Sequence, residues 1–196
     1  MFYVDDFLTD EALESIREFV LTSTFWIDNK NAYLGTYLRN GFGSPLLNQI
    51  QEELRQLFPK VFCDHALQQA WGYKYDEELL SGIKVHADEA SVNVNFWITP
   101  DEANLDPSSG GLIVYHTTSS IGLNFEDYNV GKDIMHRIIE EHDYQNITVP
   151  YGYNRAVIFR SDMFHATDNF KFKKGYKNRR INLTLLFGEM YAGQIC

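Results

Sequence analysis

The chain has 196 residues, of which 44% are hydrophobic, 22% are charged and 15% are aromatic, so it can bury a core without disulfides or a structural metal. Twenty-seven acidic and seventeen basic residues give a net charge of −10, which disfavours binding to nucleic acids and to anionic membranes. The sequence starts without a basic, apolar leader and contains no apolar run of membrane-spanning length, so we expect a cytoplasmic protein that binds neither nucleic acid nor membrane.

Residues 1–67 are predicted to be a mainly helical N-terminal part. Thr9 is a suitable N-cap for a first helix, because apolar residues recur at helical spacing after it. A second helix is predicted to start at Ser44, which precedes a proline, and to end before Pro59. Between these helices, residues 25–43 are rich in Asn, Gly and aromatic residues, which indicates short extended segments joined by turns.

Residues 68–188 have the pattern of a β-sheet protein. Short strand-like segments are separated by Gly, Pro, Asp, Asn and Ser, without the alternating helices that a parallel sheet requires. One helical segment is predicted near residues 132–142. The predicted strands are 68–75, 81–88, 91–99, 110–115, 146–150, 154–159 and 179–188. This pattern predicts a sandwich or jelly roll in which the N-terminal helices cover one of the two sheets. We expect residues 1–196 to form one domain.

A candidate metal site involves three residues that are distant in sequence. His86 and Asp88 lie two positions apart in a predicted strand, so their side chains are expected on the same face. Taken alone, this pair is compatible with a surface turn. His165, however, lies just after a later predicted strand and a short turn. Because a late strand of a jelly roll can return beside an early one, His165 can lie close to His86 and Asp88. Two imidazoles and one carboxylate form a facial triad, which suits ferrous iron and leaves three coordination positions open.

A candidate anion anchor lies in the last predicted strand. Arg180, Asn182 and Thr184 alternate with apolar residues and would share one face, which we expect to look into the barrel. A guanidinium placed there can bind a carboxylate with two parallel hydrogen bonds and so anchor an acidic cosubstrate. Arg179 is the alternative anchor, and it would point the opposite way.

The strand predicted at residues 91–99 also has one polar face, which contains Asn93 and Asn95. If this face is the inner one, either asparagine can bind the cosubstrate or a metal-bound ligand. The alternative is that the face is exposed to solvent.

The segments His86-Ala87-Asp88, His165 and Arg180-Ile181-Asn182 resemble the His-x-Asp, His and Arg-x-Ser pattern of the iron(II)- and 2-oxoglutarate-dependent oxygenases. The resemblance is greatest to the prolyl-hydroxylase-like branch, and it is most specific over residues 68–188. Asn182 stands in place of the family's serine, and the 15 positions from His165 to Arg180 are more than is usual in that branch.

The resemblance implies a double-stranded β-helix (jelly roll) that holds Fe(II) on His86, Asp88 and His165. It also implies 2-oxoglutarate as cosubstrate, with its far carboxylate on Arg180. With O₂, such an enzyme hydroxylates an unactivated C–H group of a protein side chain or small metabolite and releases succinate and CO₂. Two alternatives are a cupin-type metalloenzyme that does not use 2-oxoglutarate and a non-catalytic jelly-roll binding module.

The branch commonly has a tyrosine three residues before the first metal histidine, where this chain has Ile83. We therefore expect Tyr73 or Tyr75, on the preceding strand, to supply the hydroxyl that contacts the cosubstrate. For each tyrosine the alternative is a ring that only packs in the sheet.

Overall fold

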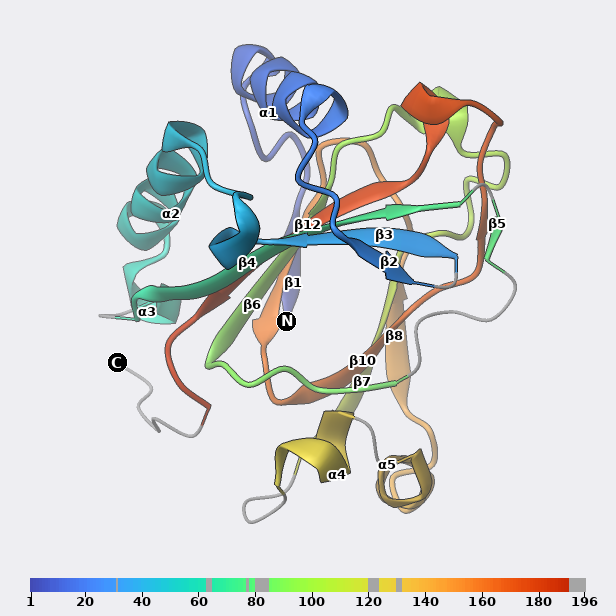
Figure 1. Cartoon of the computed structure of the whole chain (residues 1–196). Coiled ribbons are helices and arrows are strands. Elements are labelled where there is room, and N and C mark those ends of the chain that lie inside the picture. Colours follow the sequence, from blue (N-terminus) through green and yellow to red (C-terminus); the bar gives the residue numbers. More distant parts are fainter. Residues whose placement is uncertain are drawn as a thin grey trace.

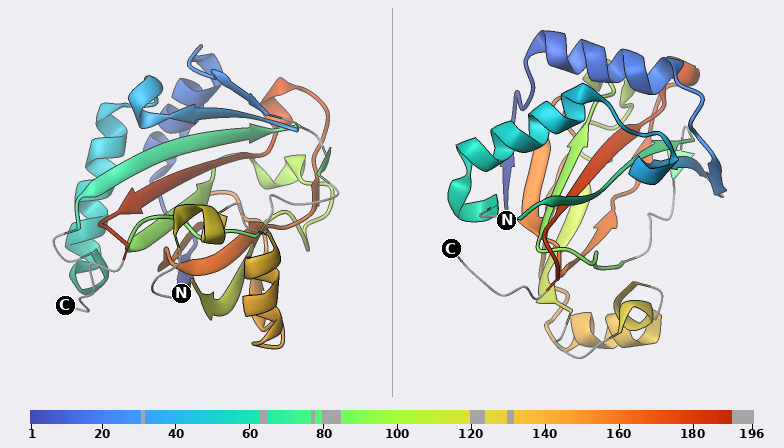
Figure 2. Two further views of the ribbon diagram at one scale, coloured as in Figure 1. Left: turned by 60° about the horizontal axis from the view of Figure 1, so that its bottom comes forward. Right: turned by 60° about the vertical axis from the view of Figure 1, so that its left-hand side comes forward.

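Antiparallel sheets form the body of the molecule (Figures 1 and 2). The structure is a computed structural model, and it describes residues 1–30, 32–62, 65–76, 78–79, 85–119, 124–129 and 132–190. Within these ranges, the order of strands in the large sheet is β1 (Phe2–Val4), β9 (Ala156–Arg160), β6 (Val92–Trp97), β12 (Ile181–Phe187), β4 (Leu67–Tyr75), β3 (Tyr33–Tyr37) and β2 (Asp28–Lys30). The order in the small sheet is β10 (Met163–Thr167), β7 (Leu112–Thr118) and β8 (Asn146–Val149). A further pair consists of β11 (Phe170–Lys171) and β5 (Glu78–Leu79).

This architecture confirms the predicted fold class, a mainly β jelly roll with flanking helices. Strands that are distant in the sequence lie side by side, since β12 pairs with both β4 and β6. Helices α1 and α2 cover one face of the large sheet, and the small sheet lies on its other side together with α4 and α5 (Figures 1 and 2). No helix in the described ranges is long and apolar enough to cross a membrane.

The predicted helices form where their caps indicated. Thr9 caps α1 (Asp10–Thr22), and Ser44 caps α2 (Pro45–Leu57), in each case by accepting a hydrogen bond from a first-turn backbone N–H. The remaining helical segments are α3 (Pro59–Phe62), α4 (Phe125–Asn129), α5 (Lys132–Glu140) and the 3-10 turns η1 (Leu38–Asn40), η2 (Asp101–Ala103) and η3 (Tyr176–Asn178). Helix α4 was not predicted from the sequence, whereas α5 falls within the predicted helical segment.

The N-terminal part contributes strands as well as helices. Strands β2 and β3 are the extended segments predicted within residues 25–43, and they extend the large sheet beyond β4. The expectation that residues 1–67 are mainly helical missed β1, which pairs with β9 through Phe2 and Ile158. Three residues are too few to show an alternating pattern, so this strand depends on its pairing with β9 rather than on local sequence.

The outer face of the large sheet packs against α1 and α2 to form the main hydrophobic core. Ile181, Leu183 and Leu185 of β12 point to this side and are fully buried. The helices contribute their predicted apolar stripes, namely Leu13, Ile16 and Val20 from α1 and Leu47, Ile50 and Leu54 from α2. The opposite, inner face of β12 is polar and borders the cavity described next.

Candidate metal centre and adjoining cavity

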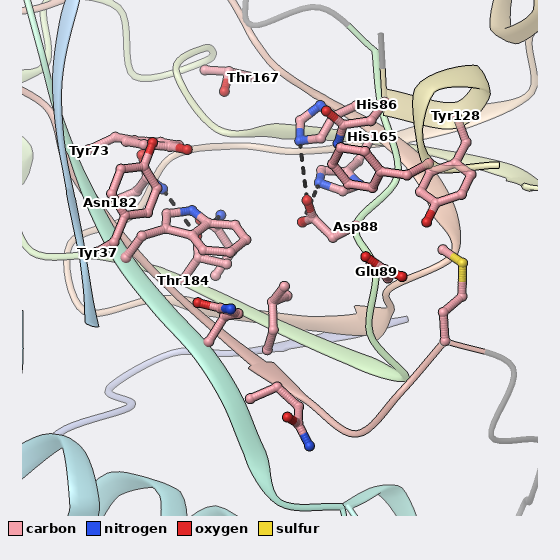
Figure 3. A pocket seen from close by; sticks show the side chains of 18 of the residues that line it. Tyr37, Tyr73, His86, Asp88, Glu89, Tyr128, His165, Thr167, Asn182 and Thr184 are labelled. Carbon is pink, nitrogen blue, oxygen red and sulfur yellow. Dashed lines mark hydrogen bonds and ion pairs between the residues drawn. The ribbon is translucent and has the colours of Figure 1, made fainter. Parts of the chain in front are cut away.

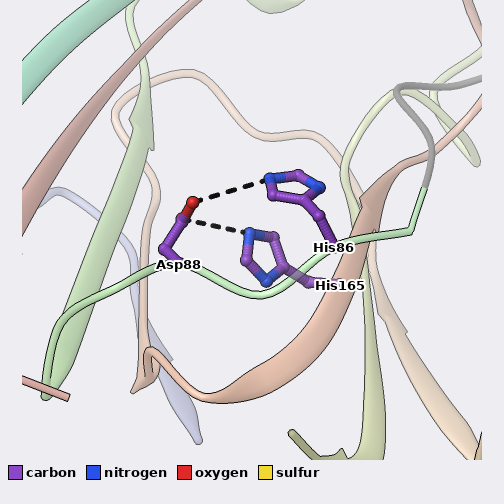
Figure 4. A group of neighbouring side chains, drawn as sticks. All are labelled: His86, Asp88 and His165. Carbon is purple, nitrogen blue, oxygen red and sulfur yellow. Dashed lines mark ion pairs between the residues drawn. The ribbon is translucent and has the colours of Figure 1, made fainter. Parts of the chain in front are cut away.

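Three side chains converge at one end of the barrel (Figure 4). His86, Asp88 and His165 each offer a ligand atom, and these atoms all lie within 4.8 Å of one another. The distance from His86 Nε2 to Asp88 Oδ1 is 3.7 Å, and that from His165 Nε2 to Asp88 Oδ2 is 3.4 Å. The sequence pattern therefore identified three residues that the fold does bring together.

The backbone that carries the first two candidate ligands, His86 and Asp88, does not form the regular strand that the sequence predicted. His86 forms an isolated bridge with His165, in which each backbone N–H donates to the other's carbonyl at 3.0 and 2.8 Å. The N–H of Asp88 instead donates to the carbonyl of Ser161. Since consecutive residues bond to different segments, residues 85–88, the described part of the predicted strand, form no continuous ladder, and the next strand along the chain is β6.

Helix α4 holds the peptide between the two ligands. The N–H of Ala87 donates to the carbonyl of Tyr128 at 2.9 Å, and the Asn129 side-chain amide donates to the carbonyl of Ala87 at 3.2 Å. Sequence reasoning missed this contact, because nothing in the short helix indicates which distant segment it approaches. Behind the ligands, Ala87 and Phe164 pack into a small apolar cluster with α4 and α5.

His165 is oriented by its backbone and by a neighbouring ring. Its Nδ1 donates to the carbonyl of Met163 at 3.0 Å, and this contact directs Nε2 toward Asp88. The strand is irregular here, because the register between β10 and β7 shifts between Met163 and His165. The Phe159 ring lies edge-on to the imidazole, with its centroid 5.0 Å away.

The carboxylate of Asp88 is buried and held in its ionised form. Burial raises the pKa of Asp88, but the contacts with His165 and His86 and the amide of Asn93 outweigh it, so the pKa lies below its usual value. The side chain of Asn93 donates to Oδ2 at 2.7 Å. A charged carboxylate that faces two imidazole nitrogens needs a cation or protons at its centre, so this donor set fits a metal ion. Two imidazoles and one carboxylate fit ferrous iron in particular.

A cavity of about 1410 Å³ opens beside the three ligands (Figure 3). One wall is the inner face of β3, β4 and β12, and another is α4. Five aromatic side chains of β3 and β4 line it, namely Tyr33, Tyr37, Trp71, Tyr73 and Tyr75. Asn95, Asn182 and Thr184 add polar groups on the same sheet, so the cavity combines ring faces with hydrogen-bonding groups near the metal site.

Arg180 is almost fully buried beside the cavity. The side chain is 1% exposed, and Tyr75 and Asn182, which contact it, line the cavity wall. Its guanidinium donates to the carbonyls of Gly110 and Gly111 at 2.7 and 3.2 Å and to Asn182 Oδ1 at 3.2 Å. Burial lowers the pKa of Arg180, although a guanidinium remains charged at neutral pH.

The acceptors of Arg180 depend on glycine. Gly110 has a φ of +88°, a conformation that side chains rarely adopt, and a Cβ on Gly111 would lie 1.8 Å from the carbonyl oxygen of Val149. Two successive glycines thus let the chain pass close to β8 and direct both carbonyls at the guanidinium. These acceptors come from a loop 70 positions away, so the sequence around Arg180 does not reveal them.

Arg179 points the other way, as expected for the neighbouring position in a strand. Its guanidinium pairs with Asp76 at 2.6 Å on the surface, and its carbonyl accepts a hydrogen bond from Thr99 Oγ1. Of the two candidate anchors, only Arg180 therefore points into the barrel. That it binds a cosubstrate stays a prediction.

The remaining predicted site residues differ in what they contact. Asn95 lines the cavity and donates to Thr184 Oγ1 at 3.1 Å, whereas Asn93 is absent from the cavity wall and contacts Asp88. Tyr73 lines the cavity, and burial raises its pKa. The hydroxyl of Tyr75 lies 3.5 Å from Thr167 Oγ1. Ile83, where the resemblance expected a tyrosine, lies outside the described residues.

Comparison with solved structures finds the same fold in several oxygenases. HygX from Streptomyces hygroscopicus, solved with nickel and 2-oxoglutarate bound, matches with a TM-score of 0.62 at 12% identity, over 96% of this chain and 82% of that one. A viral collagen prolyl hydroxylase from Paramecium bursaria chlorella virus 1 matches with a TM-score of 0.60 at 10% identity, over 95% and 93%. The fold is that of the prolyl-hydroxylase-like oxygenases.

A third match is a prolyl hydroxylase from Trichoplax adhaerens in complex with a peptide fragment of hypoxia inducible factor. It has a TM-score of 0.60 at 11% identity, over 98% of this chain and 87% of that one. No protein-family model matches the chain, and no curated protein matches its sequence. At sequence identities of 10–12%, the similarity to these prolyl-hydroxylase-like structures extends to the fold and does not establish the activity of this chain.

Proposed function

We propose that the protein is an Fe(II)- and 2-oxoglutarate-dependent dioxygenase that hydroxylates a C–H group and releases succinate and CO₂. The observation that carries this proposal is the convergence of His86, Asp88 and His165 within 4.8 Å beside a large cavity. Two imidazoles and one carboxylate on one face leave three positions of an octahedral ion open. When bound, iron and 2-oxoglutarate supply the oxidative chemistry, and the protein supplies ligands, orientation and exclusion of water.

The second support is a buried cation beside the cavity. Arg180 is fully buried among aromatic rings, where an unpaired charge is costly. We infer that the far carboxylate of 2-oxoglutarate pairs with its guanidinium, with the Tyr75 and Thr167 hydroxyls and the Asn182 amide close by. Tyr73, on the cavity wall, is the alternative hydroxyl partner. A cupin-type enzyme that works without 2-oxoglutarate would have no need for this cation.

The substrate is proposed at the level of class, as a protein side chain or a small metabolite. The cavity is large enough for either, and its wall offers aromatic faces together with amide groups. Among proteins of the same fold, the Trichoplax enzyme was solved with a peptide fragment and HygX with hygromycin B. Both kinds of ligand are therefore compatible with this barrel.

The test is an anaerobic titration of the metal-free protein with Fe(II) and then with 2-oxoglutarate. We expect a visible charge-transfer band that needs both components, and succinate formation once O₂ is admitted. The matched control is His136→Ala, which removes an exposed histidine of α5 and should leave both signals unchanged. Iron binding without the band would favour the cupin-type alternative, and absence of iron binding would favour a non-catalytic module.

A further inference from the structure

Asn93 is a buried polar residue that the proposed reaction does not use directly. It lies on the inner face of β6, it is 0% exposed, and its amide donates to Asp88 Oδ2 at 2.7 Å. Since an ionised carboxylate only accepts, the amide nitrogen must be the atom that faces it. Its partners across the sheet, Phe159 and Leu186, are apolar and do not compete for this amide.

The two oxygens of Asp88 are thereby made unequal. Oδ2 accepts the short hydrogen bond from Asn93 and also lies 3.4 Å from His165 Nε2, whereas Oδ1 faces His86, 3.7 Å from its Nε2, and receives no hydrogen bond from Asn93. The N–H of Asp88 is also fixed, because it donates to the carbonyl of Ser161 at 3.1 Å. The carboxylate is thus held both through its backbone and through one of its oxygens.

We propose that Asn93 is a positioning residue that makes Asp88 a one-oxygen ligand, an inference that rests on the metal site of the proposed function. A carboxylate that bound through both oxygens would occupy a fourth coordination position. The three positions left open by a one-oxygen ligand are the number that a two-oxygen cosubstrate and dioxygen need together. Partners that hydrogen-bond to a metal ligand usually tune metal affinity 10- to 100-fold.

The chain contains a matched control for this residue. Asn95 lies two positions along the same strand, on the same inner face, and is equally an asparagine. Its amide donates to Thr184 Oγ1 at 3.1 Å rather than to Asp88. Replacing Asn95 therefore changes a polar group near the cavity without changing the partner of the metal ligand.

The test uses Co(II) alone, without 2-oxoglutarate, so that it reads the metal site and not turnover. Calorimetry and visible absorption would be recorded for the wild type, Asn93→Leu, Asn93→Ala and Asn95→Leu, together with the melting temperature of each metal-free protein. We expect both Asn93 variants to bind Co(II) about 10- to 100-fold more weakly and to show an altered ligand-field spectrum as Asp88 binds through both oxygens. Asn95→Leu should stay within about twofold of the wild type.

Four results would overturn the inference. If a folded Asn93 variant binds Co(II) as tightly as the wild type, Asn93 does not position Asp88. If Asn95→Leu loses as much Co(II) affinity as the Asn93 variants, the effect does not depend on the hydrogen bond to Asp88. Weaker Co(II) binding with an unchanged ligand-field spectrum would show that Asn93 does not determine how many oxygens of Asp88 bind the metal. If the wild type itself binds no Co(II), the proposed function fails together with this inference, whereas the first three results leave the proposed function standing.

Discussion

The two faces of strand β12 differ sharply, although their residues alternate along one segment. On the outer face, Ile181, Leu183 and Leu185 join the apolar core beneath α1 and α2. On the inner face, Asn182 and Thr184 line the cavity, in line with Arg180 just before the strand. The difference indicates that one side of the sheet maintains the fold while the other holds the groups for chemistry. Substitutions on the two sides should therefore have separable effects.

Lys74 is the exception on the outer face. It is 0% exposed, and its Nζ lies 4.2 Å from the ring centroids of both Trp26 and Tyr176. The ammonium donates to the Tyr176 hydroxyl at 2.6 Å, and that hydroxyl donates to the carbonyl of Leu21. Burial, followed by the charge of Arg179, lowers the pKa of Lys74 to about 8. Aromatic rings thus surround this buried charge on the outer face.

The largest effect on the fold is expected for Leu183→Ala on the outer face. Truncating a fully buried leucine should lower the free energy of unfolding by about 2–5 kcal/mol, because it leaves a cavity between the sheet and its helices. Denaturant unfolding would measure this loss. Co(II) affinity of the folded fraction should match the wild type, and a parallel loss of metal binding would contradict the separation of the two faces.

The largest effect on the metal centre is expected for Asp88→Asn. This nearly isosteric change removes the only acidic member of the triad, so Co(II) or Fe(II) should bind at least about 100-fold more weakly, since even partners of ligands cost 10- to 100-fold. Calorimetry measures the affinity. The melting temperature of the metal-free protein should change less than in Leu183→Ala, and retention of tight binding would show that other residues hold the metal.

Lys74→Met sharpens the comparison through its pH dependence. An unfolded lysine has a pKa near 10.5, so between about pH 8 and 10.5 the unfolded chain binds more protons at this position than the folded chain. Wild-type stability should therefore rise with pH across this window, relative to the variant, by about 1–2 kcal/mol. Urea unfolding of both proteins at several pH values measures the difference. A flat difference would mean that the rings and the Tyr176 hydroxyl fully offset burial.

The smallest of these effects is expected for Arg180→Lys. The substitution keeps the positive charge but removes the planar guanidinium, which can bind a carboxylate with two parallel hydrogen bonds. We therefore expect 2-oxoglutarate to bind roughly tenfold more weakly and Fe(II) affinity to be unchanged. Arg179→Lys is the matched control, because that side chain pairs with Asp76 at the surface. Titration of the charge-transfer band with 2-oxoglutarate compares the two. A larger loss in Arg179→Lys would move the anchor to the outer side of the sheet.

The parts of the fold with strong local signals could be predicted from the sequence. Thr9 and Ser44 marked two helices, and period-two alternation marked β6 and β12. The convergence of His86, Asp88 and His165 could also be predicted, because a late strand of a jelly roll can return beside an early one. These features depend on neighbours within a few residues or on a general rule of topology.

What could not be predicted depends on contacts between distant segments. Residues 85–88, the described part of the predicted strand, form no continuous strand, because their peptide groups bond in turn to β10, to α4 and to the turn before β10. Arg180 is held by the carbonyls of Gly110 and Gly111, and Asn93 donates to Asp88, and neither contact was predicted. In each case the partner is set by three-dimensional packing, which the local sequence does not reveal.

The shifted register ahead of His165 has an evolutionary consequence. In a strand, moving the chain by one position exchanges the two sides, so a single-residue deletion near Met163 would turn Phe164 toward the cavity and His165 toward the apolar cluster. One short deletion would thus remove His165 from the candidate metal centre without changing the sequence of the large sheet or of its covering helices.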